Sequence, residues 1–268
     1  MRRLIIRPGA IGDCILALPA MDFLRSDYTE VWVARPNVPL IRFADCVGAI
    51  PDTGLDLAGI PGYEPPGALM ERLAWFDSIV SWYGTKRPEF REAVSGLPFA
   101  FLDALPPGGP RIHAADFFLE QVGGAAPAVP RIDCPRAPGE YVVIQPFSGS
   151  AKKNWPLERY RELAHRLDAR VCWCAGPEEP RDGAVRFDDL YELACWLAGA
   201  RLYLGNDSGI AHLAAASGAP VLALFGPSDP ALWAPRGERV RVVATPRPGE
   251  PMEAIGLDRV LAAAREML

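Results

Sequence analysis

Three loops carry the residues whose types and spacing suit chemistry, and the first reads Pro8-Gly9-Ala10-Ile11-Gly12-Asp13. Gly9 and Gly12 allow the backbone a tight turn from a strand into a helix. Asp13 then stands at the start of that helix, where an aspartate can serve as the N-cap. The same carboxylate can accept a proton from a hydroxyl that becomes acidic as it attacks. The two roles are compatible, so the loop holds a candidate general base.

The second loop contains hydroxyl residues, a glycine and two lysines, in the order Ser148-Gly149-Ser150-Ala151-Lys152-Lys153-Asn154-Trp155-Pro156. It follows a strand pattern and leads into a helix that we expect to begin at Pro156 or Leu157. Small polar residues and positive charge before a helix start suit a diphosphate. A solvated surface turn is the alternative interpretation, and the Trp-Pro ending favours the functional one.

The third loop gives the most specific signal of the three, with the sequence Gly205-Asn206-Asp207-Ser208-Gly209-Ile210-Ala211-His212. Asp207 or Ser208 is expected to cap a helix, so that the amides of Ser208 and Gly209 point out of the helix N-terminus. Such amides form an anion site built from backbone. His212 lies one turn further along the same helix face, where a structural role and a supporting role at the anion site are equally open.

One more acidic residue follows a strand pattern, in Gly176-Pro177-Glu178. Glu178 is thereby placed at a ligand-binding edge, where its carboxylate can hold ribose hydroxyls, although an exposed loop acid explains it equally well. The sequence contains no Asp-x-Asp pair near a strand end and no cluster of His, Cys, Asp and Glu with metal-ligand spacing. We therefore expect no metal site and no cofactor, and lysine with a helix dipole must then stabilise the diphosphate.

Strand and helix patterns alternate along the chain, which indicates parallel sheets covered by helices on both faces. The strands are expected at 3–7, 31–34, 79–82, 141–145, 171–175, 202–205, 221–225 and 240–243. The helices are expected at 14–25, 157–167, 189–197 and 209–216. Gly and Pro are dense between 123 and 139, which is typical of a linker. We therefore expect two doubly wound domains facing a cleft, residues 1–137 and 138–268, with a last helix at 257–268 that packs back on the first domain.

Composition excludes several classes of protein. The chain has 268 residues and a formal net charge of -5, whereas proteins that bind nucleic-acid backbones usually carry a basic excess. The sequence lacks a run of about 18 apolar residues that would span a membrane, so we expect at most peripheral membrane contact. The six cysteines form no Cys-x-x-Cys pair, and we interpret them as buried free thiols of a cytoplasmic protein.

These loops together resemble the family 9 glycosyltransferases, the ADP-heptose:lipopolysaccharide heptosyltransferases. The resemblance rests on three motifs in the right order, together with Phe225-Gly226-Pro227-Ser228 after the third, and it spans nearly the whole chain except for about residues 35–135. One departure stands out, because the second loop usually opens with His-Pro-Gly and here reads Gln145-Pro146-Phe147.

The resemblance implies a GT-B fold, inverting transfer without a metal, and a lipid-linked saccharide acceptor held by the N-terminal domain. Asp13 is then the catalytic base on the acceptor hydroxyl. The remaining implied residues belong to the donor site: Ser148, Ser150 and Lys153 in the second loop, Asp207, Ser208, Gly209 and His212 in the third, and Glu178 near the ribose.

The expected function is therefore transfer of a heptose from ADP-heptose to a lipopolysaccharide core or a related lipid-linked glycan. The expected place is the cytoplasm, in peripheral contact with the inner membrane surface. Three alternatives stay open. They are a transferase with another nucleotide-sugar donor or acceptor, a non-catalytic nucleotide-sugar binding protein, and a nucleotide-sugar hydrolase or epimerase.

Overall fold

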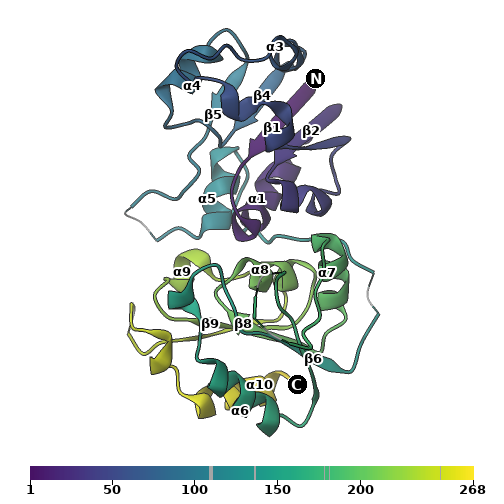
Figure 1. The fold of residues 1–268 in the computed structure, drawn as a ribbon, viewed down its shortest axis with the longest axis vertical. Coiled ribbons are helices and arrows are strands. Elements are labelled where there is room, and N and C mark those ends of the chain that lie inside the picture. Colours follow the sequence, from purple (N-terminus) through teal and green to yellow (C-terminus); the bar gives the residue numbers. More distant parts are fainter. Residues whose placement is uncertain (109–110, 136, 178, 181, 248) are drawn as a thin grey trace. The chain divides into compact units, whose positions relative to one another are not determined.

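The computed structural model describes residues 1–108, 111–135, 137–177, 179–180, 182–247 and 249–268 (Figure 1). The chain forms two compact units. The first consists of Met1–Pro110 and Ala114–Ala128, and the second of Arg111–His113 and Val129–Leu268. The units thus divide at Ala128, upstream of the expected boundary after residue 137. One reason is that the backbone of Ile132 donates a hydrogen bond to the carbonyl of Ala216 (2.9 Å) in the second unit.

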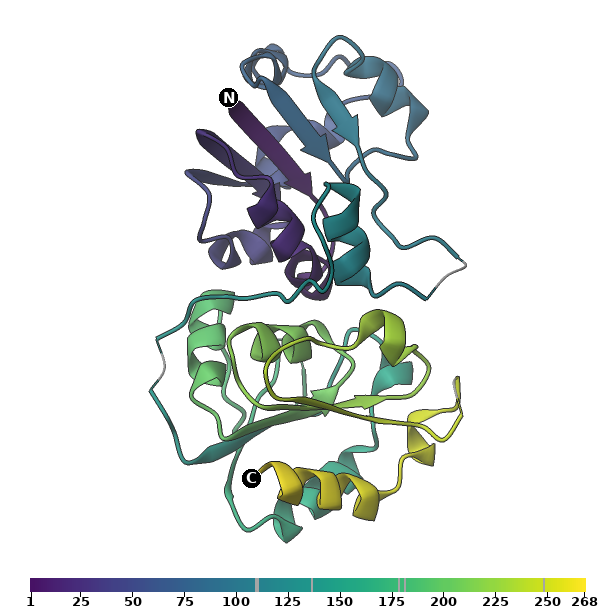
Figure 2. The ribbon, with the colours of Figure 1, turned by 180° about the vertical axis from the view of Figure 1, so that it is seen from behind.

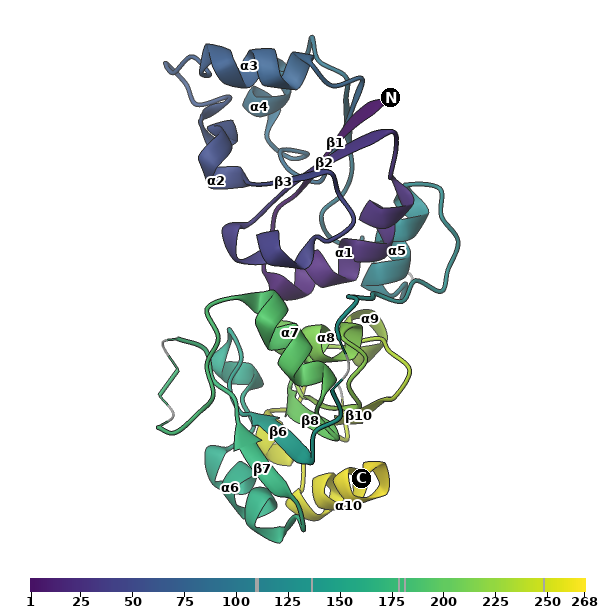
Figure 3. The ribbon, with the colours of Figure 1, turned by 90° about the vertical axis from the view of Figure 1, so that its right-hand side faces the viewer.

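The first unit contains a five-stranded sheet in the order β3-β2-β1-β4-β5. All its strands are parallel: β1 (Arg2–Arg7), β2 (Tyr28–Val33), β3 (Cys46–Ala49), β4 (Ser78–Ser81) and β5 (Phe99–Phe101). Helices α1 (Ile11–Phe23) and α5 (Ala114–Gln121) cover one face. The other face carries α2 (Ile50–Thr53), α3 (Gly67–Ala74) and α4 (Pro88–Ala93), with the 3-10 turns η1 (Arg35–Leu40) and η2 (Leu55–Leu57) in the connections (Figure 3).

Side chains along β1 alternate between the two faces of the sheet, and this alternation determines where Arg7 lies. Leu4 and Ile6 belong to the apolar cluster that also holds Ile50, Leu69 and Phe90, on the side of α2, α3 and α4. Because side chains alternate between the faces of a strand, Arg3, Ile5 and Arg7 point to the side of α1 and α5. The last residue of β1 is therefore an arginine that is buried beneath the start of α1.

The second unit repeats the architecture with the strand order β10-β9-β8-β6-β7. Its parallel strands are β6 (Tyr141–Gln145), β7 (Arg170–Trp173), β8 (Leu202–Asn206), β9 (Val221–Phe225) and β10 (Val240–Ala244). Helices α7 (Leu190–Ala198) and α8 (Gly209–Ala216) cover one face, and α6 (Leu157–Arg166) and α10 (Leu257–Met267) cover the other (Figure 1). The short elements are η3 (Ala151–Lys153), α9 (Pro230–Trp233) and η4 (Met252–Ala254).

The last helix corrects one expectation. From the sequence we expect this helix to pack back on the first domain, but α10 lies beside α6 in the second unit (Figure 2). The reason is its apolar stripe, because Val260, Leu261 and Ala264 join the core formed by β6, β8 and β9. The helix therefore completes the second domain.

The eight expected strands are confirmed, but β3 and β5 were not expected from the sequence. Both are edge strands of three or four residues that pair with one neighbour each. Short edge strands carry little hydrophobic periodicity, so the pattern of the sequence does not indicate them.

Candidate functional site

The sequence-predicted residues that the structure describes lie at the carboxyl edges of the two sheets, where the strand order reverses. In the first sheet the strand order reverses between the neighbouring strands β1 and β4, and the loop that carries Gly9 and Asp13 follows β1. In the second sheet the strand order reverses between β6 and β8; the second loop follows β6 and the third loop follows β8. Open parallel sheets bind ligands at such switch points. Each unit therefore presents its candidate residues at the edge where a ligand is expected.

In the first loop, Gly9 makes the turn that the sequence indicates. Its φ is +119°, and an added Cβ would lie 2.8 Å from Asp13 Cβ and 2.9 Å from Asp13 Oδ2. Glycine is thus required there both by its backbone angle and by the closeness of Asp13. Gly12 is the second residue of α1 and lies outside the set of described glycines with positive φ, so it does not make the turn.

Asp13 is the third residue of α1, not its N-cap, which is Ala10. The carboxylate nevertheless satisfies the helix start, because Oδ2 accepts a hydrogen bond from the Ala10 amide (3.0 Å). Within the described part of the chain no hydrogen bond to Oδ1 is found. The side chain is partly exposed. One carboxylate oxygen is thus fixed by the backbone while the other remains available to a hydroxyl.

In the second loop, Lys153 forms the central contact. Its Nζ lies 2.7 Å from Asp207 Oδ2, in an ion pair whose lysine side chain is 36% exposed and whose aspartate side chain is 7% exposed. Ser228 Oγ also donates to Asp207 Oδ2. The structure thus brings the second and third loops together through one carboxylate oxygen. We define Lys153, Asp207 and Ser228 as the carboxylate-centred cluster.

Ser148 and Ser150 shape the second loop from within. Ser148 Oγ is within hydrogen-bond distance of the Ser150 carbonyl (2.8 Å) and of Asn154 Oδ1 (2.9 Å). Its oxygen also accepts from the Ser150 amide (3.4 Å). These contacts hold the loop in a closed turn just before η3, which carries Lys153.

Asn206 anchors the second loop to the sheet, a role not predicted from the sequence. It is fully buried, and its Oδ1 accepts from the Trp155 amide (3.0 Å) and from the Tyr160 hydroxyl (2.7 Å). Its Nδ2 donates to the Pro146 carbonyl (2.7 Å). The signal for this role is a polar amide at the end of an apolar strand, because a buried amide needs partners.

The third loop leads into α8 through Ser208, which is the N-cap. Its Oγ accepts from the Ala211 amide (3.3 Å). Gly209 is the first residue of the helix, so its amide is among those without an intrahelical acceptor. His212 is 6% exposed and lies one turn beyond Ser208, with its backbone amide 3.4 Å from the Ser208 carbonyl. Ser208 is thus the cap, and Asp207 is left to pair with Lys153.

The acid expected near the ribose, Glu178, lies outside the described residues. Its neighbour Glu179 is described, and its Oε2 accepts from the Gly176 amide (2.6 Å) and from Gln145 Nε2 (3.4 Å). Gln145 Oε1 in turn accepts from the Tyr203 hydroxyl (3.1 Å) and from Ser208 Oγ (3.4 Å). Burial raises the pKa of Tyr203 well above its ordinary value, so this hydroxyl stays protonated and donates. A polar chain thus links Glu179 to the start of α8.

Among the described residues, no group of three or more His, Cys, Asp and Glu side chains could hold a metal ion. No helix in the same part of the chain is long and apolar enough to cross a membrane.

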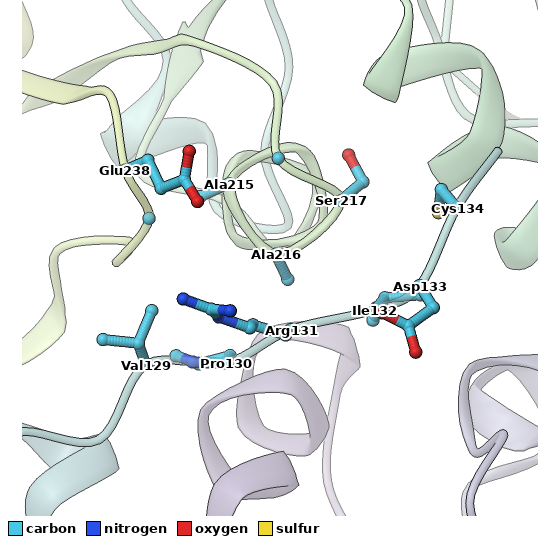
Figure 4. Close-up of a pocket in the computed structure, with 12 residues that line it drawn as sticks. Val129, Pro130, Arg131, Ile132, Asp133, Cys134, Ala215, Ala216, Ser217 and Glu238 are labelled. Atoms are coloured by element: carbon cyan, nitrogen blue, oxygen red, sulfur yellow. The ribbon is translucent and has the colours of Figure 1, made fainter. Parts of the chain in front are cut away.

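A pocket of about 170 Å³ opens elsewhere in the second unit (Figure 4). It lies between the segment 129–134 and the end of α8, and Arg131, Ser217 and Glu238 are among the residues that line it. Ser208 caps the start of α8 and Ala216 ends the helix, so its eight residues separate the two by about 12 Å. The pocket is therefore distinct from the loops at the carboxyl edge.

The likeness to known proteins agrees with this geometry. The chain is 32% identical over 126 residues to lipopolysaccharide heptosyltransferase 1 of Pseudomonas aeruginosa, a match that covers 41% of this chain and 33% of that protein. It is also 32% identical over 128 residues to lipopolysaccharide heptosyltransferase 1 of Escherichia coli (strain K12), covering 42% of this chain and 40% of that protein. The matched segment thus spans about a third to two fifths of these relatives.

The fold is similar over its full length to a solved structure, E. coli heptosyltransferase WaaC with ADP, with a TM-score of 0.71, 20% identity and 100% of each chain covered. This likeness confirms the expected GT-B fold of two Rossmann-like domains. The family model for glycosyltransferase family 9 (heptosyltransferase) matches residues 116–254, more than half of the sequence. The chain therefore belongs to glycosyltransferase family 9, the heptosyltransferase family.

Proposed function

We propose that this protein transfers a heptose from ADP-heptose to a lipopolysaccharide core or a related lipid-linked glycan, with inversion and without a metal. The observation that carries the proposal is the carboxylate-centred cluster of Lys153, Asp207 and Ser228 next to the N-cap of α8. It combines a partly exposed ammonium with helix amides at the switch point of the second sheet. This is the chemistry that a nucleoside diphosphate requires.

In the donor half, positive charge comes from two sources. Lys153 supplies a full charge, and the N-terminus of α8 supplies a partial positive charge through its unpaired amides. Both are in place before the reaction, so they stabilise the departing diphosphate without reorganisation. This is the physical basis for proposing that no metal is needed. Ser148 and Ser150 line the same loop, and His212 supports the helix start.

Sugar and ribose hydroxyls need acceptors in the same half. Asp207 is placed to bind the diphosphate-linked sugar, because its carboxylate is already fixed by Lys153 and Ser228. For the ribose, Glu178 stays a proposal. Glu179 is a second candidate, since its carboxylate lies between Gly176 and Gln145 at the carboxyl edge of the sheet.

In the acceptor half, Asp13 is the proposed general base. The acceptor hydroxyl donates its proton to the carboxylate while its oxygen attacks the anomeric carbon from the face opposite the diphosphate. The bond from the anomeric carbon to the diphosphate oxygen breaks, and the leaving group is ADP. One attack on this face inverts the configuration. The hydrogen bond from Ala10 holds the base in place during this step.

The partners follow from this reaction. They are a nucleoside diphosphate sugar and a lipid-linked saccharide, and the relatives are named lipopolysaccharide heptosyltransferases. We therefore propose that the protein works in the cytoplasm and meets its acceptor by peripheral contact with the inner membrane surface.

The first test is the thermal stabilisation of the protein by ADP, UDP, GDP and dTDP, with Mg²⁺ and with EDTA. A ligand at 100 times its dissociation constant adds about 2.7 kcal/mol to the free energy of unfolding. We expect ADP to give the largest shift, equal in Mg²⁺ and EDTA. A larger shift with UDP or dTDP would reject the adenine donor, and a shift that needs Mg²⁺ would reject metal independence.

Two lysines provide a matched pair of variants for this measurement. Lys153→Ala should abolish most of the ADP shift, because it removes the ammonium from the cluster. Lys152→Ala should keep the shift, since Lys152 is an exposed neighbour on the same 3-10 turn. Equal behaviour of the two variants would contradict the donor site.

The second test is turnover of ADP-heptose with and without a lipopolysaccharide-core acceptor. We expect ADP release that depends on the acceptor, and a glycosidic product with inverted anomeric configuration by NMR. Donor consumption without acceptor would indicate a hydrolase or epimerase. Tight binding of the donor with no product from any acceptor would indicate a binding protein.

A further inference from the structure

Gln145 is a buried amide at the carboxyl end of β6, and its side chain is 3% exposed. Strand β6 lies between β7 and β8 in the sheet. Gln145 therefore lies between the segment that follows β7, which carries Glu179, and the segment that follows β8, which carries Ser208. The amide is thus the middle of a polar line that crosses the carboxyl edge of three neighbouring strands.

The direction of this amide is determined by what its neighbours can donate. Gln145 Nε2 lies 3.4 Å from Glu179 Oε2, and a carboxylate oxygen accepts hydrogen bonds without donating them. The nitrogen must therefore face Glu179, because the reverse orientation of the amide would bring two acceptors together. Oε1 then accepts from the Tyr203 hydroxyl (3.1 Å) and from Ser208 Oγ (3.4 Å). A side chain at position 145 thus needs a donor on one side and an acceptor on the other.

The sheet holds the amide in this place. Tyr203 is fully buried, and its hydroxyl occupies the space above Gly205. A Cβ added to Gly205 would lie 2.5 Å from the Tyr203 hydroxyl oxygen and 2.9 Å from the Gln145 carbonyl oxygen. If Gln145 turned away, the contact with this buried hydroxyl would be lost, and a buried hydroxyl without a partner is costly.

Glu179 is folded back over the start of its own loop. Its Oε2 accepts from the Gly176 amide (2.6 Å), and its backbone amide donates to the Gly176 carbonyl (3.2 Å). Arg186 donates to the carbonyl of Gly176 and to that of Glu179 (2.8 Å). One carboxylate oxygen is thus held by two donors, the Gly176 amide and Gln145 Nε2. In the described part of the chain no hydrogen bond to the other oxygen, Oε1, is found.

The two donors to Oε2 have different effects. The Gly176 amide fixes the position of this oxygen, but a single contact lets the carboxylate rotate about it. The second donor, from Gln145, fixes the plane of the carboxylate and with it the direction of Oε1. An ordered side chain loses less conformational entropy when it binds, so Oε1 is a prepared acceptor for hydroxyl groups.

We propose that Gln145 is a positioning residue that sets the preference of the donor site for ribose: its amide fixes the carboxylate plane of Glu179, so that Glu179 Oε1 accepts hydrogen bonds from the ribose hydroxyls. The inference rests on the proposed nucleoside diphosphate donor. It goes further, because it names Glu179 as the ribose acid and gives Gln145 a role. On its other side the same amide contacts Ser208, so the ribose and the diphosphate share one support.

The test is the ratio of the dissociation constants of 2′,3′-dideoxy-ADP and ADP, measured by calorimetry on the whole chain. Loss of hydrogen bonds to a carboxylate should make this ratio about ten or more. Gln145→Met offers neither donor nor acceptor and should lower the ratio by about threefold or more.

Glu179→Ala should abolish the discrimination, and adding Gln145→Met to it should change the ratio no further, because Gln145 acts through Glu179. An unaltered ratio in Gln145→Met or in Glu179→Ala would overturn the proposal.

Two more variants separate positioning from fold stability. At about pH 8 the imidazole of Gln145→His is neutral and has one N–H and one acceptor nitrogen, so this variant should restore most of the ratio. The double variant of Gln145→Met with Tyr203→Phe removes the hydroxyl that Gln145→Met leaves unpaired. It should melt at a higher temperature than Gln145→Met while its ratio stays low, and it carries the comparison if Gln145→Met does not fold. A ratio that returned together with the melting temperature would refute a positioning role.

The ribose preference does not depend on the base, so its failure differs from that of the proposed function. If UDP or GDP binds more tightly than ADP, the adenine donor is rejected, and the dideoxy form of that nucleotide decides the role of Gln145 by the same ratio. If ADP binds without preference over its dideoxy form, the proposed donor stands and the inference falls. If no nucleoside diphosphate binds, both are rejected.

Discussion

Replacement of Asn206 should both destabilise the second unit and weaken donor binding. The side chain makes three hydrogen bonds, with the Trp155 amide (3.0 Å), the Tyr160 hydroxyl (2.7 Å) and the Pro146 carbonyl (2.7 Å). Asn206→Ala removes all three and leaves their partners inside the protein. Each buried polar group that loses its partner costs about 1–3 kcal/mol. Because the second loop can relax toward water, we expect the free energy of unfolding to fall by an amount near the lower end of the sum for three groups, about 4 kcal/mol.

Hydrogen exchange measured by mass spectrometry separates this effect by unit. Peptides from β6 and β8 should exchange faster by the factor that corresponds to this loss, about 10³-fold where exchange needs unfolding of the unit. Peptides from β1 serve as the internal reference and should not change. Lys153 is carried by the same loop, so the thermal shift with ADP should fall in parallel.

Two variants make the comparison specific. Ser217→Ala removes one hydrogen bond of a buried hydroxyl, to the Ala214 carbonyl within α8 (2.9 Å), and should cost less than 1 kcal/mol. Asn206→Asp keeps an oxygen for Trp155 and Tyr160 but loses the donor to Pro146. Its loss of unfolding free energy should therefore lie between those of Ser217→Ala and Asn206→Ala. A loss below about 1 kcal/mol for Asn206→Ala would refute the assignment of Asn206 as the anchor of the second loop.

Two other predictions concern the first unit. Asp13→Ala should lower turnover by about 10²-fold or more while the ADP thermal shift stays near that of the unaltered protein, and unchanged turnover would reject Asp13 as the base. Asp77 should stabilise the fold in a pH-dependent way, because hydrogen bonds from the Arg2 side chain and amide lower its pKa to about 2. A lowered pKa stabilises the folded state above the unfolded value of 3.8, and this contribution disappears as the pH falls toward 2. In urea titrations the stability difference between the unaltered protein and Asp77→Asn should therefore shrink between these two pH values, and a difference that is constant with pH would contradict the pairing.

The architecture was predictable where the chain repeats a strong local pattern. Each strand that the sequence indicates is a run of apolar residues that ends in a Gly-bearing or polar loop, and parallel strands buried on both faces produce such runs. In the region about 35–135 the pattern is weaker. There β3 and β5 are short edge strands, and α2, α3 and α4 have at most eight residues each. Short elements gain their stability from tertiary packing, which a single sequence does not display.

Within the candidate site, the sequence predicts the loops but not the partners of their side chains. The cluster of Lys153, Asp207 and Ser228 joins residues that lie 54 and 21 positions apart. Their meeting depends on the neighbouring positions of β6, β8 and β9 in the sheet. Asp13 shows a different limit. Its hydrogen bond to the helix start is local, but the sequence predicts Asp13 as the N-cap, whereas it is the third residue of α1. Local chemistry identifies such residues more reliably than it assigns their exact place.

The ion pair of Lys153 and Asp207 gives a reason for the presence of a carboxylate in the proposed diphosphate site. An aspartate repels phosphate oxygens, and alone it would oppose donor binding. Here Asp207 is 7% exposed and its Oδ2 accepts from both Lys153 and Ser228, so these two donors compensate most of its negative charge.

The lysine side chain is 36% exposed, which leaves its ammonium accessible to a second anion. The carboxylate therefore holds the ammonium beside Asp207, the residue that precedes the N-cap of α8, without a bound donor. An ammonium on a flexible four-carbon side chain loses conformational entropy when it binds, and a lysine that is already held loses less. This preorganisation is the physical reason to expect that Asp207→Ala weakens ADP binding even though it removes a negative charge.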